Sequence, residues 1–184
     1  DKAIGGGLRR KCVDLIGARP KIGKTTFADH VALYVSLTLG IPVLMLDTEM
    51  DEFGHLNRII SNMSEIDIDL IQTGKFSNSG YHSKTVADVA AKLKEAKYFY
   101  RNVSGKNFDS ILSIAKQWIH NSVGFNDDGS TKSCLIIYDY FKLMNGDEIS
   151  ASMQEYQALG FQITKLHNFC VKYDVPCLSF IQLN

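Results

Sequence analysis

Two continuous apolar runs that end in acidic residues are the clearest feature of the hydrophobic pattern. The run 43–46 leads into Asp47-Thr48-Glu49, and the run 134–138 leads into Asp139. Short unbroken apolar runs are typical of parallel strands that are buried on both faces of a sheet. Both runs are therefore predicted to be central strands.

The remaining elements alternate between strand and helix. Further strands are predicted at 12–16, 98–103 and 176–181, and helices at 24–39, 53–62, 64–72, 85–97, 109–121 and 152–173. Residues 77–83 are predicted to be a loop, and Thr85 with Asp88 is predicted to form the capping box of the helix that follows. This alternation indicates an α/β fold with a mainly parallel sheet and helices on both faces, in a single domain over 1–184.

Composition restricts the class of protein. The chain has 20 basic and 20 acidic residues, so bulk charge gives no argument for nucleic-acid binding, and any such contact depends on local side chains or on charges outside this segment. Four cysteines without a C-x-x-C pair indicate buried, reduced thiols, and five scattered histidines indicate surface or capping roles. No apolar stretch is long enough for a membrane span, so a cytoplasmic protein without a membrane partner is expected.

A phosphate-binding loop is predicted between the first strand and the first helix. Backbone N–H groups before Thr25 can surround a phosphate, Lys24 can reach the β- and γ-phosphates of ATP, and the Thr25 hydroxyl can bind Mg²⁺. The alternative is an ordinary loop at a helix start with an exposed lysine. The predicted nucleotide-contacting residues are Ala18, Arg19, Pro20, Lys21, Ile22, Gly23, Lys24, Thr25 and Thr26.

Polar residues follow three other strands, where ligands of α/β sheets bind. Asp139 is a candidate ligand of Mg²⁺, together with Thr25. Glu49 is the candidate base that activates the attacking water; Asp47 competes for that role, and a simple helix-capping role for Glu49 stays open. Gln182 ends the last strand, where its amide can sense the γ-phosphate or remain merely solvated.

These residues together resemble the ATPase domain of DnaB-like replicative DNA helicases. The loop 18–28 is similar to that family's phosphate loop, which also has alanine first. Thr48-Glu49-Met50 resembles the family's Leu-Glu-Met, whose glutamate is the catalytic base, and Arg58 also falls where a similar residue is expected. The remaining similarities are Asp139-Tyr140 with Leu143-Met144, and the segment 179–184, which resembles a Ser-Gln-Leu-Asn sensor strand.

The resemblance implies a RecA-like P-loop NTPase core that binds ATP and Mg²⁺. The Gln182 strand should lie between the phosphate-loop strand and the Asp139 strand, with the Glu49 strand beyond. It further implies a hexameric ring that pulls single-stranded DNA through its centre, with a primase or helicase loader as partner.

Two parts of the family pattern are not assigned to residues of this chain. An arginine finger is expected past Asn184, and DNA-contacting loops are expected there or just after Asp139, where the chain has the acidic Asn145-Gly146-Asp147-Glu148. The segment is therefore interpreted as a possible fragment of a longer protein. The alternatives are a RecA-like recombination, repair or clock-type ATPase without helicase activity, and a domain that uses ATP only to assemble with neighbours.

Overall fold

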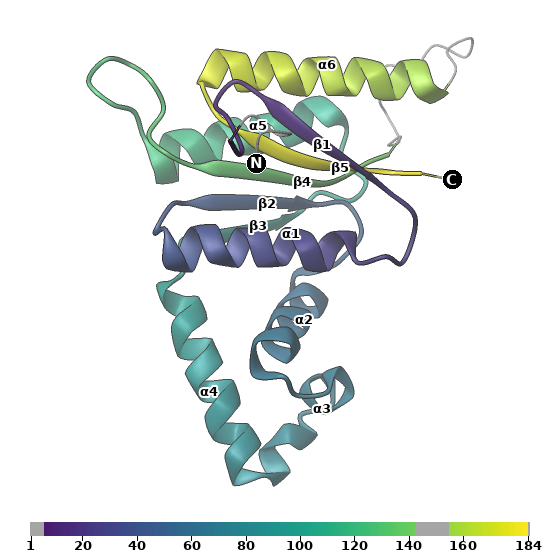
Figure 1. Cartoon of the computed structure of the whole chain (residues 1–184), viewed down its shortest axis with the longest axis vertical. Helices are drawn as coiled ribbons and strands as arrows, with labels where there is room; N and C mark the ends of the chain where they lie inside the picture. Colours follow the sequence, from purple (N-terminus) through teal and green to yellow (C-terminus); the bar gives the residue numbers. More distant parts are fainter. Residues whose placement is uncertain (1–5, 143–154, 184) are drawn as a thin grey trace.

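The computed structural model describes residues 6–142 and 155–183. Five strands form one parallel sheet in the order β1-β5-β4-β2-β3 (Figure 1). The strands are β1 (Val13–Ala18), β2 (Val43–Asp47), β3 (Tyr98–Asn102), β4 (Leu135–Phe141) and β5 (Cys177–Gln182). The predicted parallel sheet and the implied strand order are both confirmed.

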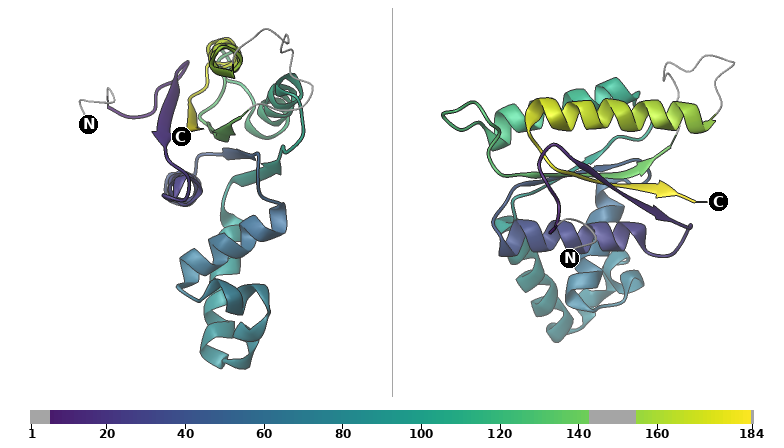
Figure 2. Two further views of the ribbon diagram at one scale, coloured as in Figure 1. Left: turned by 90° about the vertical axis from the view of Figure 1, so that its right-hand side faces the viewer. Right: turned by 45° about the horizontal axis from the view of Figure 1, so that its top comes forward.

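Helices cover both faces of this sheet, as predicted. Helix α1 (Lys24–Leu33), continued by the π-helical turn Tyr34–Thr38, packs on one face around Met45 and Ile137. Helices α5 (Phe108–Trp118) and α6 (Glu155–Tyr173) cover the other face, and a π-helical turn (Ile119–Val123) continues α5 (Figures 1 and 2). The two apolar cores explain why the central strands show no alternation of polar and apolar residues.

The central strands are buried along almost their whole length. Every residue of β2 is buried, and in β4 only Tyr140 is half-buried. The prediction that β4 ends at Asp139 is wrong, because the strand continues to Phe141. Its pairing with β5 shifts register between Tyr138 and Phe141. Asp139 therefore lies inside β4, at the point where the pairing with β5 is irregular.

A helical arm, residues 52–95, projects from the α1 side of the sheet (Figures 1 and 2). It consists of α2 (Glu52–Ser64), α3 (Ile68–Gln72), a 3₁₀ turn (Lys75–Asn78) and α4 (Gly80–Glu95). The predicted loop over 77–83 and the predicted capping box at Thr85 are wrong. Ser79 caps α4 instead, by accepting a hydrogen bond from the His82 N–H, and the Thr85 hydroxyl donates to the Tyr81 carbonyl inside the helix.

Some sequence predictions fall outside the described residues. These are the start of the last helix at 152, the motif residues Leu143-Met144 and the acidic segment 145–148. Within the ranges that are described, no helix combines the length and apolar character that a membrane crossing requires. All four cysteines are free, and three of them are buried.

Candidate functional site

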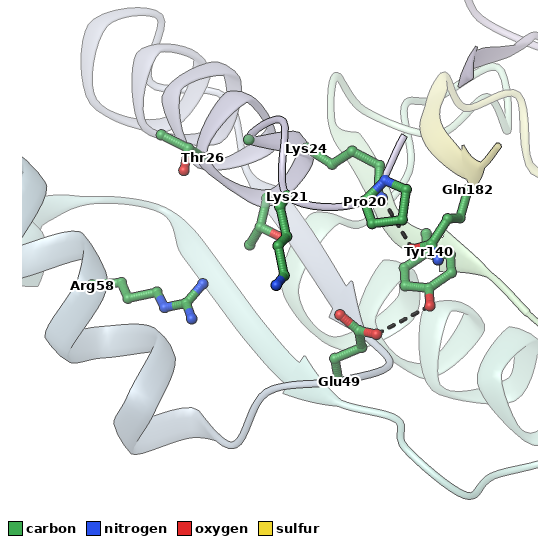
Figure 3. A pocket seen from close by; sticks show the side chains of 10 residues that line it. Pro20, Lys21, Lys24, Thr26, Glu49, Arg58, Tyr140 and Gln182 are labelled. Atoms are coloured by element: carbon green, nitrogen blue, oxygen red, sulfur yellow. Dashed lines mark hydrogen bonds between the residues drawn. The ribbon is translucent and has the colours of Figure 1, made fainter. Parts of the chain in front are cut away.

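The carboxyl ends of the parallel strands meet at one edge of the sheet, where the strand register brings the predicted site residues together. Asp47 is paired with Asp139, and Ala18 is paired with Gln182. A pocket of about 440 Å³ opens at this edge (Figure 3). Its lining residues are Pro20, Lys21, Gly23, Lys24, Thr25, Thr26, Glu49, Arg58, Tyr140 and Gln182.

The loop that forms one wall of the pocket has a backbone suited to binding an anion. Gly23 adopts a φ of 95°, in the left-handed region where a Cβ would be strained. Among the described residues other than Gly23 and its two chain neighbours, no heavy atom lies within 4 Å of the position that a Cβ would take. Glycine is therefore favoured at position 23 by the backbone conformation, and not by a lack of space for a side chain. Helix α1 starts at the next residue, and within the part of the chain that the structure describes no side-chain cap binds its first N–H groups. Those donors remain available to a phosphate.

Lys24 lies between two groups of the pocket wall. Its Nζ donates a hydrogen bond of 3.3 Å to Oε1 of Gln182 and lies 5.1 Å from the centre of the Tyr140 ring. The ammonium group is thus held at the end of β5, beside the start of α1. An anion that enters this pocket meets a positioned cation and an amide that contacts the same cation.

Thr25 and Asp139 form the part of the site that suits a divalent cation. The Thr25 hydroxyl donates to Asp139 Oδ2 at 2.6 Å, whereas Asp139 Oδ1 is buried and accepts no hydrogen bond from the described residues. Burial raises the pKa of Asp139 to about 6, and the charges of Asp47 and Glu49 act in the same direction. A cation would offset this accumulated negative charge and satisfy the free oxygen, so the residues fit Mg²⁺.

The two competing carboxylates at the end of β2 have different surroundings. Asp47 is buried, and its Oδ1 accepts hydrogen bonds from the backbone N–H groups of Glu49 (2.7 Å) and Met50 (3.0 Å). Glu49 is exposed in the pocket wall and accepts a hydrogen bond of 3.0 Å from the Tyr140 hydroxyl. Burial and the Glu49 carboxylate raise the pKa of Tyr140 to about 12, so this hydroxyl keeps its proton at neutral pH. Glu49 is therefore the carboxylate that can contact a bound ligand.

Not every residue of the predicted loop lines this pocket. Ala18 and Ile22 line an adjacent pocket of about 160 Å³, and Arg19 is exposed and lines neither pocket. Two lining residues, Arg58 and Tyr140, were absent from the predicted site. Arg58 points into the same space as Lys21 and Glu49, from helix α2 (Figure 3). The signal for Tyr140 was its position directly after Asp139, whereas Arg58 could be found only through the family resemblance.

One histidine departs from its expected surface or capping role. His55 of α2 is buried, and its Nε2 lies 2.7 Å from the Tyr98 hydroxyl and 3.3 Å from Asp29 Oδ1. Its ring stacks on Tyr100, with 4.1 Å between ring centres. The sequence did not predict this cluster because its members are far apart in the chain.

Comparison with solved structures shows the fold. The ATPase domain of G40P superposes with a TM-score of 0.82 at 20% identity, over 97% of this chain and 59% of that chain. A DnaB-like replicative helicase, described together with its interactions with primase, also gives a TM-score of 0.82 at 20% identity, over 97% of this chain and 40% of that chain. The RecA-like ATPase fold is thereby confirmed.

Comparison with curated proteins shows similar relatives. A probable plasmid replicative DNA helicase of Chlamydia psittaci is 26% identical over 171 residues, which are 92% of this chain and 34% of that protein. The replicative DNA helicase DnaB of Synechocystis sp. (strain ATCC 27184 / PCC 6803 / Kazusa) is 31% identical over 183 residues, which are 99% of this chain and 19% of that protein. The chain thus spans about a third or less of these relatives.

The family comparison covers the whole chain. Residues 1–184 match the family of DnaB-like helicase C terminal domains. This assignment agrees with the strand order and with a pocket lined by Lys24, Thr25, Glu49 and Gln182. The chain belongs to the DnaB-like helicase C-terminal domain family.

Proposed function

We propose that this chain is the ATP-hydrolysing motor domain of a replicative DNA helicase. One observation carries the proposal: Thr25, the Lys24–Gln182 pair and Glu49 line one pocket, and Asp139 is joined to it by the hydrogen bond from Thr25. These groups come from the start of α1, the turn after β2, the interior of β4 and the end of β5, and together they match the needs of phosphoryl transfer to water.

Each residue has a proposed role in that reaction. The loop 18–26 holds the triphosphate through its backbone N–H groups, and Lys24 neutralises the β- and γ-phosphates. Glu49 accepts a proton from the attacking water. Gln182, which contacts Lys24, reports whether the γ-phosphate is present. Arg58 and Lys21 add positive charge to the lining of the pocket.

Mg²⁺ is the proposed cofactor at Thr25 and Asp139. Its support is the donor set of one hydroxyl and one carboxylate, with a buried oxygen that lacks a hydrogen bond. When bound, Mg²⁺ would neutralise negative charge that develops on the phosphates. The protein's own part is to hold Asp139 on a central strand, next to the start of α1.

The longer protein is proposed to act on DNA as a ring. Its relatives are named replicative DNA helicases, and one structural neighbour is described with its primase interactions. We propose a hexamer with single-stranded DNA as substrate, a primase or loader as partner, and the cytoplasm as its compartment. In this arrangement the chain is one ATPase domain, and the arginine finger and most DNA-binding residues come from other parts of the protein.

The test is Glu49→Gln in the full-length protein, with Glu95→Gln as a control at the exposed end of α4. Glu49→Gln should retain ATP binding and lose hydrolysis by a factor on the order of 10² or more, because a positioned base contributes about that much. Glu95→Gln should hydrolyse ATP at the wild-type rate. Turnover near wild type in Glu49→Gln would remove Glu49 from the mechanism.

A strand-displacement assay on forked DNA separates the helicase from the alternative ATPases. Displacement that requires ATP and is lost in Glu49→Gln supports the helicase. DNA-stimulated hydrolysis without displacement would favour a recombination or repair ATPase instead, a reading that the family assignment does not favour.

A further inference from the structure

A bridge of four polar side chains joins α1, α2 and β3: Asp29, His55 and Tyr100 are buried, and Tyr98 is half-buried. His55 is at its centre and is only 2% exposed. Its Nε2 faces the Tyr98 hydroxyl at 2.7 Å and Asp29 Oδ1 at 3.3 Å, and its ring stacks on Tyr100. These contacts join α1, α2 and β3 in one cluster.

One end of the bridge reaches helix α1, which begins at the phosphate loop. Asp29 is four residues after Thr25 in α1, so the two side chains lie on the same face of the helix, one turn apart. Asp29 is 4% exposed, and its charge interacts with that of Asp139. A displacement of α1 would therefore move the carboxylate that lies 3.3 Å from His55 Nε2.

The other end reaches the turn that carries Glu49. The Tyr100 hydroxyl donates a hydrogen bond of 2.6 Å to the Met50 carbonyl, and the Asn102 side chain donates to the same oxygen. Asp47 also stabilises this turn, because its Oδ1 accepts hydrogen bonds from the backbone N–H groups of Glu49 and Met50. The backbone on both sides of Glu49 is thus held by side chains that do not line the nucleotide pocket.

Burying these polar groups is costly unless they are well paired, and apolar residues could fill the same space without that cost. Apolar contacts are non-directional, whereas hydrogen bonds set the separation and orientation of the groups they join. His55 Nδ1 lies 3.9 Å from Asp47 Oδ2, so the centre of the bridge also adjoins the residue that closes the turn. Two hydrogen bonds, Tyr98–His55 and Tyr100–Met50, are directional and suited to fixing a geometry. His55 Nδ1, Asp29 Oδ1 and Asp47 Oδ2 are buried without a hydrogen bond from the described residues, so their approaches contribute contact alone.

We propose that His55, Tyr98 and Tyr100 are positioning residues that fix Glu49 relative to the phosphate loop. They set the rate of the hydrolytic step and leave ATP affinity unchanged, because none of them lines the nucleotide pocket. This inference rests on the proposed role of Glu49 as the base.

The experiment uses the full-length protein with single-stranded DNA and measures kcat and KM for ATP. Tyr100→Phe removes only the hydroxyl that binds Met50 and keeps the ring on His55. We expect kcat to fall by about tenfold, because small misplacements of a reacting group are enough to slow a reaction to this extent, and KM to stay within about twofold. Tyr98→Phe removes the hydroxyl at His55 Nε2 and should lower kcat in the same way. Tyr81→Phe, at a tyrosine that is 76% exposed on α4, is the matched control and should change neither constant.

Glu49→Gln in the same assay separates failure of this inference from failure of the proposed function. If Glu49→Gln loses turnover while Tyr100→Phe and Tyr98→Phe keep the wild-type kcat, the bridge does not position Glu49, and the proposed function stands. If Glu49→Gln keeps turnover, the proposed function itself fails. A rise in KM that accompanies or replaces the fall in kcat would mean a general structural role and would also overturn the inference.

Discussion

The hydroxyl of Thr25 donates a hydrogen bond of 2.6 Å to Oδ2 of Asp139, across 114 positions of the sequence. This contact joins the first turn of α1 to the central strand β4. It also leaves Asp139 Oδ1 buried without a hydrogen bond from the described residues, beside the hydroxyl that would share a cation with it.

The first prediction concerns that hydroxyl. Thr25→Ala should lower magnesium-dependent ATP hydrolysis by about tenfold or more, because a ligand that stabilises charge in the transition state is lost. Thr25→Ser keeps the hydroxyl and should stay close to wild type. The measurement is the rate of hydrolysis by the full-length protein as magnesium is titrated. Equal rates for the alanine and serine variants at every magnesium concentration would contradict the assignment.

The second prediction concerns the pH dependence of stability. Burial raises the pKa of Asp29 from 3.8 to about 7, with the charges of Asp139 and Asp47 acting in the same direction. Burial lowers the pKa of His55 from 6.5 to about 4. Protonation of Asp29 therefore stabilises the native state as the pH falls from 7 towards 4. His55 acts in the opposite sense, because the unfolded chain takes up its proton first as the pH falls below 6.5.

The variant Asp29→Asn removes one of these two opposing contributions. The free energy of unfolding of wild type, minus that of the variant, should rise by about 1 kcal/mol for each pH unit between 7 and 4 as the pH falls. Urea unfolding of both proteins at several pH values measures this difference. A difference that does not change with pH would show that Asp29 is already ionised in the native state throughout this range.

The third prediction tests the start of α4. Ser79→Ala removes the side chain that accepts the His82 N–H and should destabilise the helix by about 1 kcal/mol. Thr85→Ala is the control, since that hydroxyl bonds to a carbonyl within the helix and caps nothing, so a smaller loss is expected. Native-state hydrogen exchange of the α4 amides measures both changes. A larger loss of stability in Thr85→Ala than in Ser79→Ala would show that α4 is capped at Thr85.

Local sequence patterns predicted several strands and helices of this protein correctly. The two continuous apolar runs predicted the central strands β2 and β4, because a strand covered on both faces needs no polar positions. The order of strand, glycine-containing loop and helix was predicted correctly around Gly23, because the φ of Gly23 and the start of α1 are local properties. Local signals were ambiguous at α4, since both Ser79 and Thr85 are suitable capping residues. The apolar pattern alone could not choose between them.

Only the tertiary structure decided which distant residues meet. Asp47 and Glu49 are equivalent in the sequence pattern, and they differ because Asp47 closes the turn with its own carboxylate while Glu49 faces the pocket. Arg58 reaches the pocket from the helical arm, and His55 is buried by α1 and β3. Periodicity reports which face of an element is apolar, but not which other element covers that face. Long-range packing therefore determined the bridge around His55, whereas the order of strand, loop and helix around Gly23 followed from the local sequence.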